Sequence, residues 1–193
     1  MREWTTIRLT EAAQVLELIG DDDAPPVAEG QALRSFYEEA RGRDAAEAVR
    51  VIGHALPRRE ALIWASHMLE LEAKASPPDR ASRHALDCVA RWLDDPEDSY
   101  RRACYDAAEA APDMAAARLL AMGAFMSGGS IAPEDSTPVL PDETSCLRIT
   151  VGAVIKTAYQ SEDTNGFLER ALLVAEDIAA LGAKAALEAD TKR

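Results

Sequence analysis

The spacing of apolar residues along the chain is that of amphipathic helices almost throughout. Apolar side chains return every three or four residues, which places them on one face of a helix. Signals such as Asp44 before a segment and Gly20 after one divide the pattern into separate helices. The predicted helices are Glu11–Ile19, Ala28–Ala40, Ala45–Ala55, Pro57–Lys74, Pro77–Leu93, Asp95–Ala111, Pro112–Met126, Leu147–Tyr159 and Asn165–Glu188.

These segments predict an all-α protein with eight or nine sequential antiparallel helices in a layered bundle or short superhelical array. We expect a single helical domain over residues 1–193, in which residues 1–9 form an extended arm. Trp64 and Trp92 lie 28 residues apart, but the residues around them do not align. The sequence therefore does not establish an internal repeat.

One apolar segment, Ile149–Ile155, has two possible structures. Its β-branched residues suit a buried strand, but no other segment offers a partner strand. We therefore predict a buried central helix there. The last predicted helix carries a narrow row of small residues that includes Ala175 and Gly182, and such a row lets a neighbouring helix approach closely.

The segment Gly128–Pro141 is the one long irregular connection. It contains three prolines and no apolar period, and it is longer than most connections between helices. Two interpretations are open. In a strap over the bundle, Ile131, Val139 and Leu140 would tuck against helices, whereas in a recognition segment they would project. We favour the strap.

Composition and charge narrow the possible partners. The 193 residues include 38 alanines and only 5% aromatic residues, so the core must consist of closely packed helices. The formal net charge is -13, and residues 103–190 hold 14 acids against 5 bases. Because nucleic-acid binding needs clustered basic side chains, we expect no nucleic-acid partner. An acidic surface favours basic protein partners.

Cysteine usage and hydropathy predict the compartment. Cys88, Cys104 and Cys146 are odd in number and lie among apolar helical residues, which indicates reduced core thiols. The first residues lack the apolar core of a signal peptide, and no apolar run approaches the roughly 18 residues of a membrane span. We therefore expect a cytoplasmic protein that does not bind membranes.

Patterns typical of catalysis or metal binding are missing from the sequence. It contains no Glu-x-x-His pair, no His-Glu-x-x-His, no Cys-x-x-Cys and no Gly-x-Ser-x-Gly. The spacings His67-x-x-Glu70 and His84-x-x-Asp87 are interpreted as surface hydrogen-bonded pairs. We predict neither a metal nor a cofactor.

The start of the predicted helix at Pro57 holds the strongest candidate site. Arg58 and Arg59 occupy a first turn that already carries unpaired N–H groups and partial positive charge. One interpretation is an anion or acidic-partner site, to which Trp64 and His67 on the same helix would belong. The other is a structural ion-pair cluster. Its acids would be Glu60 together with Asp21, Asp22 or Asp23.

The three tryptophans supply most of the large aromatic area. The default expectation is a buried ring whose indole N–H donates to a carbonyl, and an interface anchor is the alternative. Trp4 precedes the first predicted helix, so we expect it to be the most exposed of the three.

Two segments carry a resemblance to a known family. They are His54-Ala55-Leu56-Pro57-Arg58-Arg59-Glu60-Ala61-Leu62-Ile63-Trp64-Ala65 and Ser127-Gly128-Gly129-Ser130-Ile131-Ala132-Pro133. Together they resemble an uncharacterised all-helical family of bacterial proteins that occurs among type VI secretion components. The resemblance implies a cytoplasmic accessory or adaptor role and supplies no catalytic residues.

Two functions follow as hypotheses. The first is a non-enzymatic helical interaction module that binds a protein partner through a helix face or the loop Gly128–Pro141, as an accessory to a secretion or other assembly. The second is a small-molecule-binding or metal-dependent helical enzyme with a pocket near Arg58, Trp64 and His67.

Overall fold

The computed structural model describes residues 3–20 and 27–192, and these residues form ten α-helices. The prediction of an all-α protein is confirmed, but the predicted count of eight or nine helices is too low. Within the described ranges, extended pairing is limited to an isolated antiparallel bridge between Glu11 and Ala32. The helices are α1 (Ala12–Ile19), α2 (Leu33–Arg43), α3 (Ala45–Ala55), α4 (Arg58–Ala75), α5 (Arg80–Asp94), α6 (Asp98–Ala110), α7 (Ala116–Phe125), α8 (Ser145–Gln160), α9 (Thr164–Leu181) and α10 (Ala183–Asp190).

The additional helix arises at Gly182, where the segment predicted as one helix is two. Gly182 has a φ of 79°, a backbone conformation that glycine adopts without steric cost. The side chain of Glu60 in α4 accepts a hydrogen bond from the backbone N–H of Ala183 at 3.0 Å. A carboxylate that is distant in sequence thus accepts a hydrogen bond from an otherwise unpaired N–H group in the first turn of α10, which stabilises the break between α9 and α10.

Several predicted helix starts are displaced by a few residues. Asp44 caps α3 as predicted, and its side chain accepts a hydrogen bond from Ala46 N. Helix α5, in contrast, begins at Arg80 and not at the predicted Pro77, because its cap is Asp79. The Asp79 carboxylate accepts from the backbone N–H groups of Ala81 and Ser82 at 2.9 and 3.0 Å. An aspartate that satisfies two backbone donors is the better cap.

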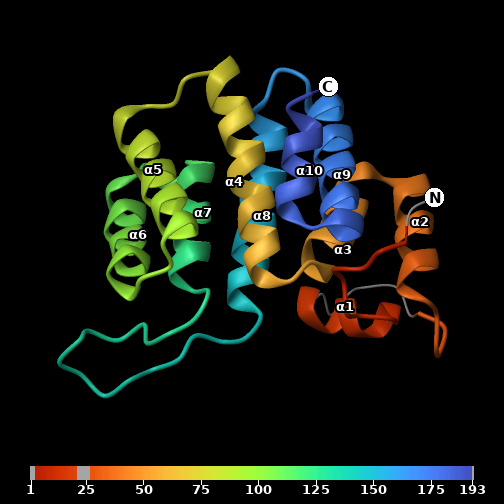
Figure 1. The fold of residues 1–193 in the computed structure, drawn as a ribbon, viewed down its shortest axis with the longest axis horizontal. Helices are drawn as coiled ribbons and strands as arrows, with labels where there is room; N and C mark the ends of the chain where they lie inside the picture. The colour runs from red at the N-terminus through yellow and green to blue at the C-terminus, as the bar shows by residue number, and fades with distance from the viewer. Residues whose placement is uncertain (1–2, 21–26, 193) are drawn as a thin grey trace.

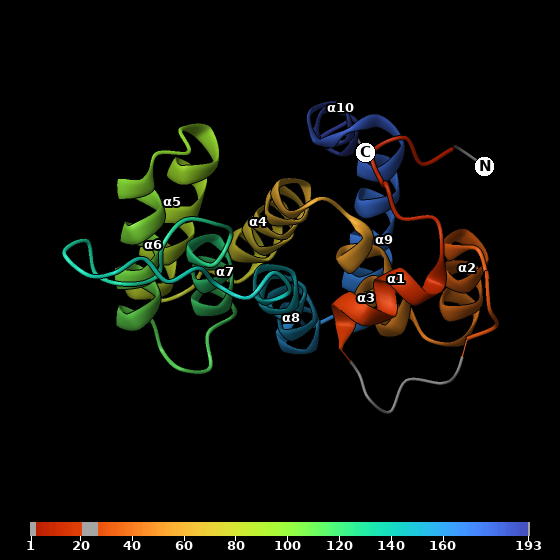
Figure 2. The same ribbon diagram turned by 90° about the horizontal axis from the view of Figure 1, so that it is seen from below.

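The helices form two groups with α4 and α8 between them (Figures 1 and 2). Helices α5, α6 and α7 make up one group, and α1, α2, α3, α9 and α10 make up the other. Helix α8 contacts α7 and α4 as well as α3 and α9. It contains the ambiguous segment Ile149–Ile155, in which Val151 and Val154 are buried. The prediction of a buried central helix is therefore confirmed.

Close helix packing at the centre depends on Gly53 of α3, because glycine has no side chain. A Cβ atom at Gly53 of α3 would lie 2.7 Å from Cγ2 of Val151 and 2.9 Å from Cζ3 of Trp64. Both distances are shorter than van der Waals contact, so only glycine fits there without movement of its neighbours. Glycine at position 53 therefore lets α3 approach α8 and the Trp64 ring closely.

The residues before α1 run alongside α9. Thr5 N and Thr6 N both donate to the carbonyl oxygen of Ala179 at 2.9 Å. The Trp4 ring is half-buried, with its centroid 5.1 Å from that of Tyr37 and 4.3 Å from the Arg34 guanidinium. Residues 1 and 2 of the predicted arm lie outside the described residues.

Candidate functional site

Arg58 and Arg59 begin α4 and are both exposed. Arg58 Nη2 donates to the carbonyl oxygen of Glu143 at 3.0 Å, and Arg59 Nη2 donates to that of Leu93 at 2.9 Å. The predicted ion pair with Glu60 is wrong, because the Glu60 carboxylate caps α10 instead. The other acids of that prediction, Asp21, Asp22 and Asp23, lie outside the described residues.

A small apolar pocket adjoins the two arginines. Its volume is about 230 Å³. The residues that line it are Arg58, Arg59, Trp92, Leu93, Pro96 and Ser127. The pocket thus joins the start of α4 to the end of α7, where the second segment of the family resemblance begins.

Trp64 and His67 do not contribute to this pocket. The Trp64 side chain is fully buried, and its Nε1 donates to the carbonyl oxygen of Ala171 in α9 at 3.0 Å. His67 Nε2 lies 2.8 Å from Oδ2 of Asp190, which also accepts from Arg170 at 3.0 Å. These contacts join α4 to α9 and α10. Of the predicted set Arg58, Trp64 and His67, only Arg58 lines this pocket.

The two predicted surface histidine pairs are wrong. His67 binds Asp190, while Glu70 accepts hydrogen bonds from Arg83 at 3.0 to 3.2 Å. His84 is exposed, and its Nε2 lies 3.7 Å from the Cys88 sulfur.

The loop Gly128–Pro141 projects beyond the ends of α6 and α7 (Figure 1). Val139 is 51% exposed and Leu140 is 73% exposed, whereas Ile131 is half-buried. The predicted strap is therefore wrong, and the alternative of projecting side chains is the one observed. The reason is that the loop closes on itself. Ser130 Oγ accepts from the backbone N–H groups of Ala132 and Val139 at 3.1 Å, which satisfies loop groups without the bundle.

A buried arginine in α6 fixes the base of this loop. Arg101 is 4% exposed, and it donates to the carbonyl oxygens of Phe125 at 2.6 Å and Ser130 at 2.8 Å. Its Nε donates to Asp98 at 2.7 Å. Gly129 has a φ of 68°, and a Cβ there would lie 3.0 Å from Arg101 Nη2. The glycine thus gives the guanidinium room to reach both carbonyls.

Arg102 reinforces the same anchor from the next position of α6. It donates to the carbonyl oxygens of Ala132 at 3.0 Å and Ser130 at 3.2 Å. Hydrogen bonds from Arg102 and Arg101 hold the pKa of Asp98 below its usual value. Sequence reasoning missed this anchor. The only signal was the spacing of an acid three and four residues before two adjacent arginines.

Both segments of the family resemblance thus contribute to one end of the molecule. The sequence profile of a family of unknown function matches residues 36–179, which is more than half of the chain. The chain belongs to the DUF6931 family. The matched DUF6931 range runs from α2 into α9 and includes the pocket, the loop and Arg101. Searches of curated proteins and of solved structures give no significant match.

The thiols of this DUF6931 protein lie where burial keeps them protonated. All three cysteines are free, as predicted; Cys104 and Cys146 are buried, and Cys88 is half-buried. Burial raises the pKa of Cys104 to about 12 and that of Cys146 to about 11. A thiol with a raised pKa is a poor nucleophile at neutral pH, because the thiolate is the reactive form.

Over residues 3–20 and 27–192, His, Cys, Asp and Glu side chains nowhere gather in a group of three that would suit a metal ion. None of the described helices combines the length and apolar character of a membrane span.

His54 gives the fold a predicted pH dependence. The ring is 4% exposed, Nδ1 donates to the carbonyl oxygen of Arg50 at 2.7 Å, and burial lowers the pKa of His54 from its usual 6.5 to about 4. Between these values the unfolded chain binds more protons than the native one, so acid destabilises the fold. We expect His54 to contribute a loss of about 2 kcal/mol between pH 7 and pH 5.

The measurement is urea unfolding of the native protein and of the His54→Gln variant at both pH values. We expect the variant to lose less stability on acidification by that amount. His84→Gln, at an exposed position, is the matched control and should keep the native pH dependence. Equal pH dependence of the native and His54→Gln proteins would contradict the prediction.

Proposed function

We propose that the chain is a non-catalytic interaction module that binds a protein partner through the loop Gly128–Pro141. The observation that carries this proposal is an exposed Leu140, at 73%, on a loop whose base is held by the buried Arg101. An anchored loop loses little conformational freedom on binding, so more of its contact energy is available for affinity. Apolar residues presented in this way serve as interface anchors.

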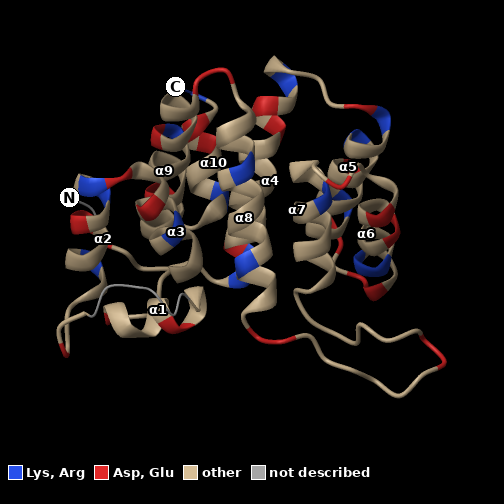
Figure 3. Ribbon diagram, turned by 180° about the vertical axis from the view of Figure 1, so that it is seen from behind, with Lys and Arg blue, Asp and Glu red and all other residues tan. Residues whose placement is uncertain are grey.

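The charge of the loop indicates the chemistry of the partner. Residues 128–141 contain no lysine or arginine, and acidic residues lie at the loop's tip and just after its end (Figure 3). The whole chain has a formal net charge of -13. The partner is therefore a protein with an apolar cleft that receives Val139 and Leu140 and that is bordered by basic residues.

The pocket beside Arg58 and Arg59 is the second part of the proposed surface. It lies at the base of the loop, because Ser127 precedes the loop and Glu143, which binds Arg58, follows it. One apolar side chain of the partner would occupy its 230 Å³, and the two guanidinium groups would contact acidic or carbonyl groups around that side chain.

The cellular setting is proposed from the family resemblance alone. The segments His54–Ala65 and Ser127–Pro133 resemble proteins that occur among type VI secretion components. We therefore propose a cytoplasmic accessory of a bacterial secretion assembly, whose partner is a component of that assembly.

Loss of the two exposed loop side chains tests the proposal. The unmodified chain should co-purify with a stoichiometric partner from the native cell. With the Val139→Ser/Leu140→Ser variant, we expect the amount of co-purified partner to be at least about tenfold lower. Its melting temperature should be unchanged, since both side chains are exposed. Affinity purification with quantitative mass spectrometry gives the recovery.

The control removes apolar area of similar exposure elsewhere. Met114 is 71% exposed and Tyr159 is 66% exposed, so Met114→Ser/Tyr159→Ser should keep the partner. Arg58→Gln/Arg59→Gln tests the pocket in the same assay. A partner that stays bound to the loop variant would rule out the loop as the interface, and the absence of any stoichiometric partner would reject the proposed function.

A further inference from the structure

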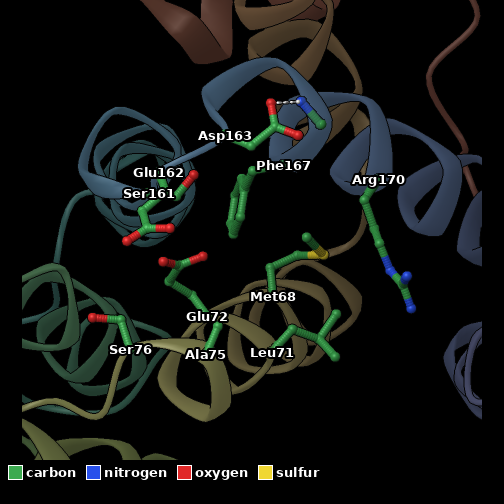
Figure 4. Close-up of a pocket in the computed structure, with 11 residues that line it drawn as sticks. Met68, Leu71, Glu72, Ala75, Ser76, Ser161, Glu162, Asp163, Phe167 and Arg170 are labelled. Carbon is green, nitrogen blue, oxygen red and sulfur yellow. Dashed lines mark hydrogen bonds between the residues drawn. The ribbon is translucent and has the colours of Figure 1, made fainter.

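A groove lies at the end of α4 that is remote from the loop (Figures 1 and 4). The 18 residues of α4 separate the two ends by about 27 Å. The groove has a volume of about 520 Å³ and runs between α4 and the turn from α8 to α9. Met68, Leu71 and Phe167 contribute apolar surface to it, and Glu72, Ser161 and Glu162 contribute polar groups.

Two acidic side chains of this groove, Glu72 and Glu162, are not neutralised, whereas the third, Asp163, caps α9. Within residues 3–20 and 27–192, the side-chain carboxylates of Glu72 and Glu162 take part in neither a hydrogen bond nor an ion pair. Arg170 also lines the groove, but Asp190 binds its guanidinium at 3.0 Å. Helices α4 and α8 both end beside the groove and add partial negative charge, while the Asp163 carboxylate offsets the partial positive charge at the start of α9. The groove therefore combines apolar surface with negative potential.

Ser161 contributes to the lining of the groove a polar atom that has no hydrogen-bond partner in the described part of the chain. Its hydroxyl oxygen is buried and has no hydrogen-bond partner among the described residues. Buried polar atoms usually have a partner in native proteins. A donor that enters the groove would supply one after rotation of the serine side chain.

A second apolar groove continues from the first. It has a volume of about 200 Å³ and shares Glu72 and Ser76 with its larger neighbour. Leu69 and Leu86 contribute to its lining, together with alanines at the start of α7. Two adjoining grooves suit an extended chain with alternating side chains better than one compact small molecule.

We infer that these joined grooves bind an extended basic peptide segment of a protein partner, in which a lysine or arginine stands beside apolar residues. The basic group lies between Glu72 and Glu162, and its aliphatic stem packs on Phe167 and Met68. An apolar neighbour occupies the second groove. This site does not depend on the loop Gly128–Pro141.

A defined peptide tests the inference on the full chain. The probe is acetyl-Gly-Leu-Arg-Leu-Gly-amide, titrated into isotope-labelled protein while the amide signals of Ser76 and Gly166 are followed by NMR. We expect saturable shifts of these signals that weaken with added salt. The Glu72→Gln/Glu162→Gln variant should bind about tenfold more weakly, because two partly exposed charge pairs are lost.

Matched controls separate the possible results. Glu17→Gln/Glu29→Gln makes the same change in net charge at exposed positions outside both grooves and should bind like the native chain. The Val139→Ser/Leu140→Ser variant should also bind normally, so failure of the loop proposal would not affect this result. Unchanged affinity of Glu72→Gln/Glu162→Gln would overturn the inference.

Two further probes identify the ligand class. The same peptide with glutamate in place of arginine should give no shifts of the Ser76 and Gly166 signals. Agmatine supplies a guanidinium without the peptide and should bind at least about fivefold more weakly than the arginine peptide. Equal affinity for agmatine and the peptide would mean a small-cation site and would overturn the peptide inference.

Discussion

Replacement of Trp64 by alanine is expected to lower the free energy of unfolding by about 4 kcal/mol. The side chain is fully buried in α4, and its indole N–H donates to the carbonyl oxygen of Ala171 in α9. The ring also fills the space that Gly53 leaves open in α3. Three helices meet at this side chain, and none can close the cavity without breaking its other contacts.

The measurement is urea unfolding followed by circular dichroism. Trp64→Phe keeps part of the ring volume and loses the indole N–H, so its loss should be smaller, about 2 kcal/mol. Trp4→Ala is the matched control, because Trp4 is half-buried and packs on Tyr37 and Arg34 at the surface. It should cost about 1 kcal/mol. A Trp64→Ala loss no larger than that of Trp4→Ala would contradict the central role of Trp64.

The position of Trp64 shows where sequence reasoning succeeded and where it failed. A buried tryptophan with its indole N–H on a carbonyl is the default for a helical core, and Trp64 follows it. Helical geometry explains why Trp64 does not share one pocket with Arg58 and His67. Nine residues along a helix turn a side chain by about 180°, so Arg58 and His67 leave α4 on opposite sides. Proximity in sequence does not place side chains on one face.

The helices themselves were largely predictable, because alanine-rich amphipathic periodicity is a local property. Their ends were less so, since distant groups decide several of them. The break at Gly182 depends on Glu60, which is far away in sequence, and the cap Asp79 starts α5 three residues after the predicted Pro77. A sequence pattern shows which residues are able to cap, but it does not show which long-range acceptor will be present.

The loop could not be predicted for a related reason. Its apolar residues Val139 and Leu140 suggested burial, but an apolar side chain is buried only where a helix face is free to receive it. Here Ser130 and Arg101 satisfy the loop's backbone groups at its base. The loop can therefore leave the bundle without unpaired polar groups. The hydrogen bonds of Ser130 and Arg101 join separate parts of the chain, so the spacing of residues in the sequence does not predict them.

Replacement of Arg101 by methionine should show whether this anchor determines binding as well as stability. Arg101→Met keeps the unbranched stem but removes charge-assisted hydrogen bonds to the carbonyls of Phe125 and Ser130. We expect a loss of about 4 kcal/mol in the free energy of unfolding. The amides of residues 128–132 should exchange hydrogen faster, and partner recovery should fall as far as in the Val139→Ser/Leu140→Ser variant.

The matched variant is Arg102→Met, in which only the outer, more exposed arginine of the pair is lost. Its side chain is 23% exposed, against 5% for Arg101, so we expect a loss of about 1 kcal/mol and nearly normal partner recovery. If Arg101→Met lowers stability while hydrogen exchange of the loop and partner recovery stay native, the arginine is only a structural residue. The other outcome is that Arg101→Met, unlike Arg102→Met, shows a large loss of stability, faster hydrogen exchange of the loop and low partner recovery. Because the apolar residues Val139 and Leu140 are still present in Arg101→Met, this outcome would mean that the partner recognises a loop held in one conformation.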